Sequence, residues 1–328
     1  MPLADTRLMP ARFQPVLLLI LACALWGLSF PVVKALHLEQ NLRIPEAGTT
    51  FLAIWMQVAR FLVAALILLP LMRGRTLPTA NEWRQGLGLA LSGGLGMGVQ
   101  AWGLAHTEAS TSAFLTQAYC VFLPMVACVK SRSRPGFRTV GATILVLLGG
   151  AILAGLRPGE LRLGSGESAT LLAALIFTFQ ILILENPRYA GNRGTPVTFL
   201  MSLGIAIGYL PFAFITAPTT AAVWTAGASI PAIALVAILA LFSSVLAFLL
   251  MNTWQKKVSA TEAGLIYTME PIFAAIYALF LPALFAGLAG FHYPNESLTG
   301  TMILGGGLIL LANLWMQWPN KRRSLTDP

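Results

Sequence analysis

Two charged residues lie deep inside long apolar runs of this chain and are the first candidates for chemistry. Glu270 directly precedes Pro271, about ten residues into the run 260–281, and Arg60 lies about as deep in the run 51–72. A charged side chain at the centre of a bilayer costs at least about 2.5–3.5 kcal/mol, so each should face a cavity or a partner. Desolvation favours a neutral carboxyl group, so Glu270 could take up a proton or bind a cationic or amino group. Arg60 could bind a substrate carboxylate.

Each of these residues also has a structural interpretation. Glu270 and Arg60 could form a buried ion pair, or Glu270 could hydrogen-bond beside the proline. Lys34 lies near the end of the first apolar run, where its long side chain can extend to the membrane surface. The sequence leaves these alternatives open.

A second group of candidates is neutral and consists of polar or aromatic side chains within apolar runs. Together they predict a cavity for a small amphipathic solute, with aromatic walls and few charges. Trp and Tyr also favour membrane interfaces, and Ser often bonds to its own helix, so each has a structural alternative. These candidates are Tyr267, Trp26, Ser29, Gln57, Gln117, Tyr119, Gln100 and Asn252.

The composition indicates the class of protein in which these residues lie. Of the 328 residues, 57% are hydrophobic and only 10% are charged, with a mean hydropathy of +0.76. Soluble domains carry about 25% charged residues. The net charge of +9 raises the possibility of nucleic-acid binding, but the basic residues punctuate apolar runs instead of forming a patch with interleaved aromatic residues. We therefore expect an all-α integral membrane protein in the lipid bilayer, and no nucleic-acid partner.

Ten apolar runs are long enough to cross a membrane. The first follows Arg7 and Arg12 like a signal peptide, but it continues to about Leu36 and is interpreted as an uncleaved helix. The ten predicted spans are 16–37, 51–72, 84–104, 110–130, 138–156, 168–186, 196–216, 229–251, 260–281 and 298–318.

Lysine and arginine predict the orientation of these spans. With a cytoplasmic N-terminus, sixteen of the 21 basic residues fall in inside segments, three fall in outside segments, and two lie within spans. This bias follows the positive-inside rule and places both termini in the cytoplasm. The tails are then residues 1–15 and 319–328.

The two halves of the chain, 16–156 and 167–318, have the features of a repeat. When Pro124 of the fourth span is aligned with Pro271 of the ninth, Thr111-Ser112-Ala113 overlies Val258-Ser259-Ala260. Five spans per half is an odd number, so the second half must be inverted, as in many secondary transporters. Interrupted helices at matching positions indicate a midplane site in such proteins. Pro124 and Pro271 are therefore predicted as helix breaks beside the site.

Three segments carry a resemblance to a known family. Trp26-Gly27-Leu28-Ser29-Phe30 with Lys34, Val58-Ala59-Arg60-Phe61, and Val258-Ser259-Ala260 with Met269-Glu270-Pro271 resemble EamA-type permeases of the drug/metabolite transporter superfamily. The likeness covers about residues 16–318. It implies ten helices in inverted five-helix repeats, the cell inner (plasma) membrane, and export of a small metabolite such as an amino acid.

The chain departs from the family pattern in three places. The loop after the first span, His37 to Thr50, is expected to be unusually long, and Pro282 to Tyr293 is an apolar insertion on the outer side. The insertion either lengthens span nine or lies in the interface. An acidic residue often found after the fourth-span proline is replaced by Lys130-Ser131-Arg132. The resemblance therefore does not determine the structure of the outer mouth or the size of the substrate.

Other functional classes have less support in the sequence. An intramembrane enzyme usually needs paired carboxylates, a histidine cluster or an activated nucleophile, but both aspartates, Asp5 and Asp327, lie in the tails. The cysteines Cys23, Cys120 and Cys128 have no metal-ligand spacing, and no phosphate-binding GxxxxGK[ST] motif is present. We therefore predict a secondary transporter with no cofactor, metal or catalytic residues, with protons as a possible coupling ion. An intramembrane enzyme or a non-transporting membrane assembly protein is the alternative.

Overall fold

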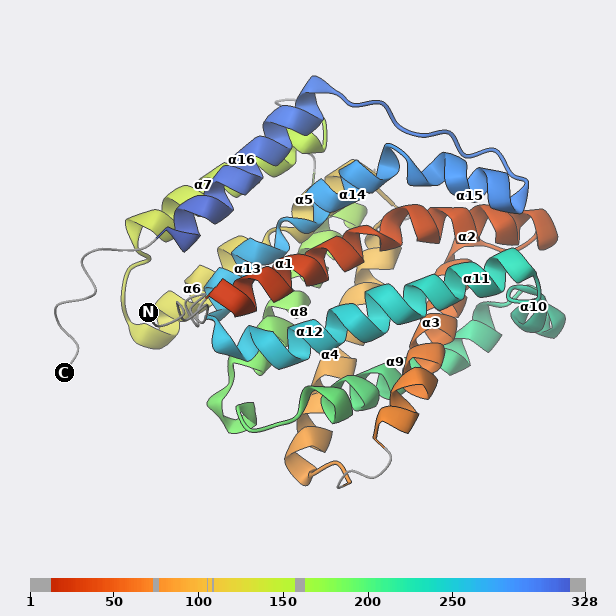
Figure 1. Ribbon diagram of the computed structural model, residues 1–328, viewed down its shortest axis with the longest axis horizontal. Helices are drawn as coiled ribbons and strands as arrows, with labels where there is room; N and C mark the ends of the chain where they lie inside the picture. The colour runs from red at the N-terminus through yellow and green to blue at the C-terminus, as the bar shows by residue number, and fades with distance from the viewer. Residues whose placement is uncertain (1–12, 73–76, 105, 108, 157–162, 319–328) are drawn as a thin grey trace, which may run out of the picture.

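The computed structural model describes residues 13–318, apart from 73–76, 105, 108 and 157–162, and every regular element in these ranges is a helix (Figure 1). The predicted cytoplasmic tails lie almost entirely outside the described residues. In the first half the helices are α1 (Phe13–Gly27), α2 (Ser29–Arg43), α3 (Thr49–Leu71), α4 (Ala80–Leu104), α5 (Ala109–Thr116), α6 (Tyr119–Ser131) and α7 (Phe137–Leu153). In the second half they are α8 (Ser165–Glu185), η1 (Pro187–Tyr189), α9 (Gly194–Thr216), α10 (Thr220–Thr225), α11 (Ile230–Ile238), η2 (Leu239–Leu246), α12 (Ala247–Trp254), η3 (Gln255–Lys257), α13 (Ala260–Tyr267), α14 (Glu270–Ala278), α15 (Leu281–Ala289) and α16 (Gly300–Gln317).

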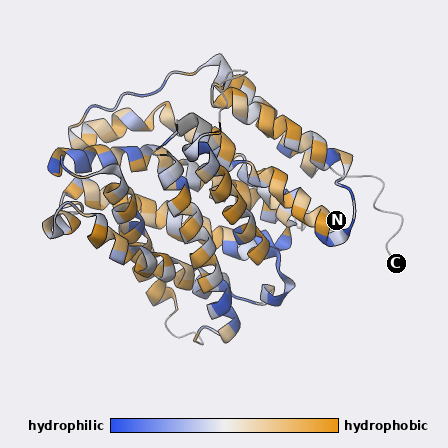
Figure 2. Ribbon diagram, turned by 180° about the vertical axis from the view of Figure 1, so that it is seen from behind, coloured by the Kyte–Doolittle hydropathy of each residue, from blue (hydrophilic) through white to orange (hydrophobic). Residues whose placement is uncertain are grey.

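The helices have the apolar surfaces of a membrane protein. Among the described residues, six helical stretches are long and apolar enough to cross a bilayer, and a seventh is formed if α13–α14 and α15 count as one bent span. Hydrophobic residues dominate the helices, while hydrophilic ones gather toward loops and helix ends (Figure 2). The all-α prediction is confirmed. The count of ten spans stays a prediction, because α7 and α16 are apolar but short, and α4 is long but less apolar.

The first span is longer than predicted. The helix continues after a kink at Leu28 as α2 and ends at Arg43, so the expected long loop from His37 is mostly helix. Glu39 and Arg43 form an ion pair of 2.7 Å one turn apart, and Gln40 donates a hydrogen bond to the carbonyl of Ala226 at 3.1 Å. These contacts give the polar end of α2 partners within the protein. The prediction of a long loop was therefore wrong.

The apolar insertion after the ninth span forms α15, which bends 55° away from α13–α14. It lies beside α2 (Figure 1), and Phe285 is buried in the apolar cluster that α2 shares with α3 and α11. Lys34 of α2 is exposed, and its ammonium lies 5.2 Å from the ring centre of Tyr293. The insertion is thus a separate helix packed on α2, and it does not extend the ninth span in a straight line.

Both the fourth and the ninth predicted spans are interrupted. α13 ends at Tyr267 and α14 begins at Glu270, with Pro271 in the first turn of α14. In the fourth span the interruption lies at Gln117 and Ala118, about two turns before Pro124, which is inside α6. The structure therefore places only Pro271 directly at a break.

Pro124 still alters the hydrogen bonding of α6. A proline has no N–H to donate to the carbonyl four residues earlier, which here belongs to Cys120. The hydroxyl of Thr143 on α7 donates to that carbonyl at 3.5 Å. The carbonyl freed by the proline thus bonds to the neighbouring helix, which explains how a proline is accommodated within α6.

α7 and α16 cross with their backbones in contact and lie side by side in Figure 1. A Cβ atom added at Gly149 would lie 2.6 Å from the carbonyl oxygen of Gly305, and one added at Gly305 would lie 2.5 Å from the carbonyl oxygen of Gly149. Small residues at a crossing allow such close approach between helices in membranes. The contact is reciprocal, because each glycine lies against the carbonyl oxygen of the other.

Candidate functional site

Glu270 begins α14 directly after the break in the ninth span. The residue is half-buried. It interacts electrostatically with three residues on other helices, Arg60, Cys23 and Tyr119. Within the described residues, Glu270 and Arg60 do not come within the 4.0 Å of a direct ion pair. The two charges therefore influence each other without neutralising one another through contact.

The backbone of α1 fixes the position of Glu270. A Cβ atom at Gly27 would lie 2.7 Å from Cβ of Phe273, 2.8 Å from the amide nitrogen of Ala274 and 3.1 Å from the carbonyl oxygen of Glu270. No larger residue fits here unless α1 or α14 moves. The end of α1 therefore packs directly on the first turn of the helix that carries the carboxylate.

Arg60 is held on the other side of this site by a π-helix. Its Nε donates a hydrogen bond of 3.1 Å to the hydroxyl of Ser244, and its guanidinium lies 4.7 Å from the ring centre of Phe61. Ser244 belongs to the π-helical segment η2, in which the adjacent Ser243 donates a hydrogen bond of 2.8 Å to the carbonyl of Leu25. Such wide helical turns are frequent at functional sites. η2 thus connects α3 with the end of α1.

A row of aromatic rings borders the two charges. Trp26 makes edge-to-face contacts with Tyr267 and with Phe248, both with ring centres 5.4 Å apart, and Phe248 lies 5.9 Å from Phe61. Aromatic faces attract cations, and their edges and faces pack against apolar groups. The row therefore supplies an apolar wall that also tolerates an ammonium group.

Two buried polar atoms in this region have no hydrogen-bond partner among the described residues. They are Nε1 of Trp26, a donor, and Oε1 of Gln57, an acceptor one turn from Arg60. A buried polar atom without a partner costs about 1–3 kcal/mol. A bound polar solute or water would remove this cost.

Other predicted site residues bond elsewhere. The hydroxyl of Tyr267 donates to Gln255 at 2.7 Å, so only its ring borders the site, and the hydroxyl of Ser29 donates to the carbonyl of Trp26 at 2.6 Å. Asn252 donates to Thr198 at 2.9 Å and joins α12 to α9.

Gln100 and Gln117 also lie outside the cluster of contacts around Glu270 and Arg60. Gln100 donates to Thr116 at 2.9 Å, and Gln117 packs against Gly150 of α7. Tyr119 is buried and joins the site through its electrostatic interaction with Glu270. The structure thus brings together Glu270, Arg60, Trp26, Gln57, Tyr119 and the ring of Tyr267.

Known proteins resemble this chain over most of its length. Residues 14–155 match the EamA-like transporter family. This part of the chain is an EamA-like domain. An uncharacterized transporter of Archaeoglobus fulgidus is 26% identical over 294 residues, which cover 90% of this chain and 82% of that protein. A crystal structure of another protein shares the fold, with a TM-score of 0.66 at 17% identity over 94% of this chain and 97% of that one.

These similarities confirm the predicted resemblance to EamA-type permeases. The EamA-like domain contains α1 to α7 and therefore carries Trp26, Gln57 and Arg60, while Glu270 lies in the second half of the chain. Together with the six or seven long apolar helices, the family and the named relative support a multi-pass membrane transporter rather than an enzyme. In the described residues no group of three or more metal-binding side chains is present.

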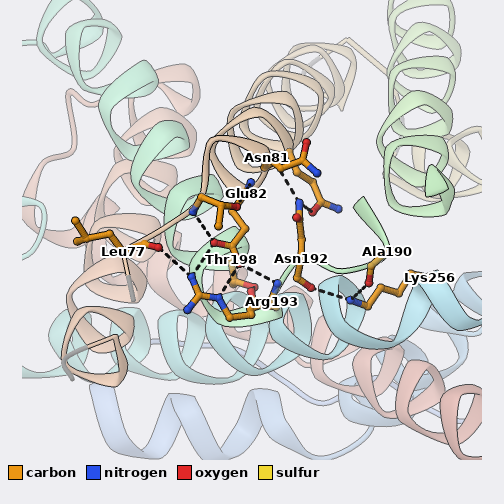
Figure 3. Close-up of polar contacts among 11 residues, drawn as sticks. Leu77, Asn81, Glu82, Ala190, Asn192, Arg193, Thr198 and Lys256 are labelled. Atoms are coloured by element: carbon orange, nitrogen blue, oxygen red, sulfur yellow. Dashed lines mark hydrogen bonds and ion pairs between the residues drawn. The ribbon is translucent and has the colours of Figure 1, made fainter. Parts of the chain in front are cut away.

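A polar cluster, which the sequence did not predict, joins the EamA-like domain to the second half of the chain (Figure 3). Glu82 at the start of α4 is only 2% exposed and accepts hydrogen bonds of 2.8 Å from Nε and Nη2 of Arg193, at the start of α9. Asn192 donates to Gln85 at 2.8 Å, and Lys256 donates to the carbonyl of Asn192 at 2.8 Å. We call the end of the bundle that holds this cluster and the segment 130–138 the basic end.

We expect Glu82→Gln to destabilise the protein by about 2 kcal/mol at pH 7. Hydrogen bonds from Arg193 lower the pKa of Glu82 from its ordinary 4.5 to about 2. Because the folded-state pKa is lowered, this stabilisation is complete above about pH 4.5 and is lost as the pH falls toward 2. The single oxygen of glutamine can still accept from the amide of Thr79, but its NH2 group cannot accept from Arg193, so the variant removes the charge and part of the hydrogen bonding to Arg193.

Apparent melting temperatures in detergent at pH 7 and pH 3 measure this effect, because the difference between wild type and Glu82→Gln should shrink at the lower pH. The exposed Glu46, in the turn between α2 and α3, provides the control variant Glu46→Gln. Equal melting temperatures for wild type and Glu82→Gln at pH 7 would show that the cluster contributes no stability.

Proposed function

We propose that the protein is a secondary transporter that exports a small amphipathic solute with an amino group by alternating access. The observation that carries this proposal is the position of Glu270. This residue is only partly buried, begins α14 after a break in the ninth span, and interacts electrostatically with Arg60 without direct contact. A solute with an ammonium and a carboxylate group would pair with both residues, its ammonium with Glu270 and its carboxylate with Arg60. The aromatic row from Tyr267 to Phe61 would pack against its apolar part.

The proposed architecture is ten spans in two inverted repeats, 16–156 and 167–318. The reciprocal contact of Gly149 with Gly305 supports it, since these glycines lie in the last span of each half. The interruptions of the fourth and ninth spans support it as well. In such folds the site lies near the midplane between the repeats.

We propose that the basic end faces the cytoplasm and that the membrane is the cell inner membrane. Arg132, Arg138, Arg193 and Lys256 lie at this end, and cytoplasmic loops carry an excess of such residues. A reporter fused after Pro328 that is active only outside the cytoplasm would contradict this orientation.

In the proposed mechanism, the two halves move against each other and expose the site to one side at a time. Glu270 binds the ammonium group of the solute or a coupling proton, but not both at once, so that the proton and the solute exchange. Arg60 stays charged and orients the solute carboxylate. Gln57 and Trp26, each with an unpartnered polar atom, add an acceptor and a donor for a polar group of the solute.

Comparative metabolite profiling tests the proposal. Medium from cells that lack the protein should be depleted of an exported solute relative to medium from cells that express it. The purified protein in liposomes should then exchange that solute across the membrane. If no solute differs between the two media and no amphipathic amine exchanges in liposomes, the proposal of an exporter fails.

A further inference from the structure

A second polar site lies at the basic end, away from Glu270. A pocket of about 350 Å³ opens among the ends of α6, α7, α13 and α16. Its lining residues include Glu262, Arg134, Ser259 and Thr261, all of which have polar side chains. Pockets that bind small solutes start at about 300 Å³. A polar pocket of this size is notable in a chain with only 10% charged residues.

Glu262 connects this pocket with the central site. It lies in the first turn of α13, is only 7% exposed, and precedes Glu270 by eight residues on the same interrupted span. A continuous helix with a rise of 1.5 Å per residue would separate these two backbone positions by about 12 Å, so the two glutamates lie at different levels of the span. Pro124 of the interrupted fourth span also lines the pocket. Each site thus combines one glutamate with one arginine: Glu262 with Arg134, and Glu270 with Arg60.

Elsewhere at the basic end, hydrogen bonds hold the helix ends together. There, the cluster of Glu82, Arg193, Asn192 and Lys256 ties α4 to α9 and η3 with hydrogen bonds of about 2.8 Å (Figure 3). The pocket lies instead between α6 and α13, the two helices that flank the interruptions. The basic end therefore offers an opening on the side of the interrupted spans.

Glu262 also has a structural role that must be separated from binding. Its amide donates a hydrogen bond of 3.2 Å to the hydroxyl of Ser259, the N-cap of α13, and the spacing Ser-x-x-Glu is that of a capping box. Glutamine at the third position serves this cap as well as glutamate. Glu262→Gln therefore removes the charge and keeps the cap.

We propose that this pocket is a loading site at which Glu262 binds the ammonium group, and Arg134 the carboxylate, of the solute before it moves to Glu270. The proposal rests on the transport function proposed above, because it assigns the same solute class to both sites. It adds a binding event on the side from which the solute is taken up. Binding at the pocket and transport through Glu270 can be measured separately.

Cys128 provides a reporter for the pocket. It lines the pocket and is half-buried, whereas Cys23 and Cys120 are fully buried. The probes are leucine, 3-methylbutylamine, which lacks the carboxylate of leucine, and 4-methylpentanoate, which lacks its amine. The full chain in lipid nanodiscs is alkylated with N-ethylmaleimide, and the rate at Cys128 is read by mass spectrometry. We expect leucine and 3-methylbutylamine to slow alkylation more strongly than 4-methylpentanoate does.

In Glu262→Gln, we expect both amines to need about tenfold higher concentrations for the same protection, as a hydrogen bond to a charged group contributes about a factor of ten or more. The control Glu46→Gln should behave like the wild type, and Glu262→Gln should elute as the same monodisperse species as the wild type. Equal protection in the wild type and Glu262→Gln, or no protection by any of the three probes, would overturn the loading site.

The variant Glu270→Gln separates the two proposals. If it loses transport and keeps protection at Cys128, the loading site is an independent binding event, as proposed. If Glu262→Gln keeps full protection while Glu270→Gln loses transport, only the loading site fails. If protection depends on Glu262 but no solute is transported, the transport function fails, and with it the role of the pocket in loading.

Discussion

Replacing Glu270 by glutamine is expected to lower the rate of solute exchange by about 10- to 100-fold. A hydrogen bond to a charged group contributes about 1.5–3 kcal/mol, and glutamine keeps the shape of the side chain but cannot carry the charge or exchange a proton. Glu270 is half-buried and faces Arg60 without direct contact, so the variant should fold. Initial rates in proteoliposomes, normalised to reconstituted protein, measure the change.

The same assay at several pH values separates a proton carrier from a simple ligand. If Glu270 exchanges a proton for the solute, the pH dependence of transport should disappear in Glu270→Gln. Glu296→Gln, at an exposed position after α15, is the matched control and should transport like the wild type. Unchanged transport with unchanged pH dependence in Glu270→Gln would remove this residue from the mechanism.

Gly305→Ala is expected to destabilise the protein by about 2–3 kcal/mol, the upper part of the range for overpacking. The added Cβ would lie 2.5 Å from the carbonyl oxygen of Gly149 and 2.7 Å from the amide nitrogen of Leu153. Backbone atoms cannot rotate away as a side chain can, so α7 and α16 would have to separate. The effect is measured by thermal unfolding in detergent, with the fraction of protein that stays monodisperse as the readout.

Gly307→Ala is the control two residues further along α16. No heavy atom of a neighbouring residue lies within 4 Å of a Cβ added there. Because alanine favours helix over glycine by about 1 kcal/mol, this variant should be neutral or slightly stabilising. The same chemical change is therefore predicted to be destabilising at Gly305 and neutral or slightly stabilising at Gly307. A Gly305→Ala variant as stable as Gly307→Ala would contradict the close crossing.

The sequence was sufficient for the helical class, the resemblance to EamA permeases and the two deep charges. Long apolar runs have few alternatives to a helix in lipid, because every backbone polar group must be satisfied within the chain. Glu270 and Arg60 stand out for a similar reason, since charges are rare at that depth. The electrostatic link between them depends on packing among α3, α1 and α14, which no local pattern encodes.

Features that depend on contacts between distant segments could not be predicted. The helix of α2 beyond His37 is stabilised by Gln40 bonding to Ala226, a residue 186 positions away. The interruption at Gln117 precedes Pro124, because the position of a break also depends on which carbonyls find partners elsewhere. The adjacent serines of η2 were the one visible signal for the partner of Arg60, as two hydroxyl groups stand out in an apolar run.

The π-helical segment η2 has a consequence for chain length in the eighth span. An α-helix turns by about 100° per residue, so a wide turn with one surplus residue shifts the angular phase of everything that follows. Before Ala247, Ser243 bonds to α1 and Ser244 bonds to α3. After Ala247, Phe248 contacts Trp26, and Asn252 bonds to Thr198. Deleting one residue from 239–246 would allow a regular α-helix but would rotate one of these two groups away from its partners. The surplus residue therefore lets the serines of η2 and the residues that follow them face their partners at the same time.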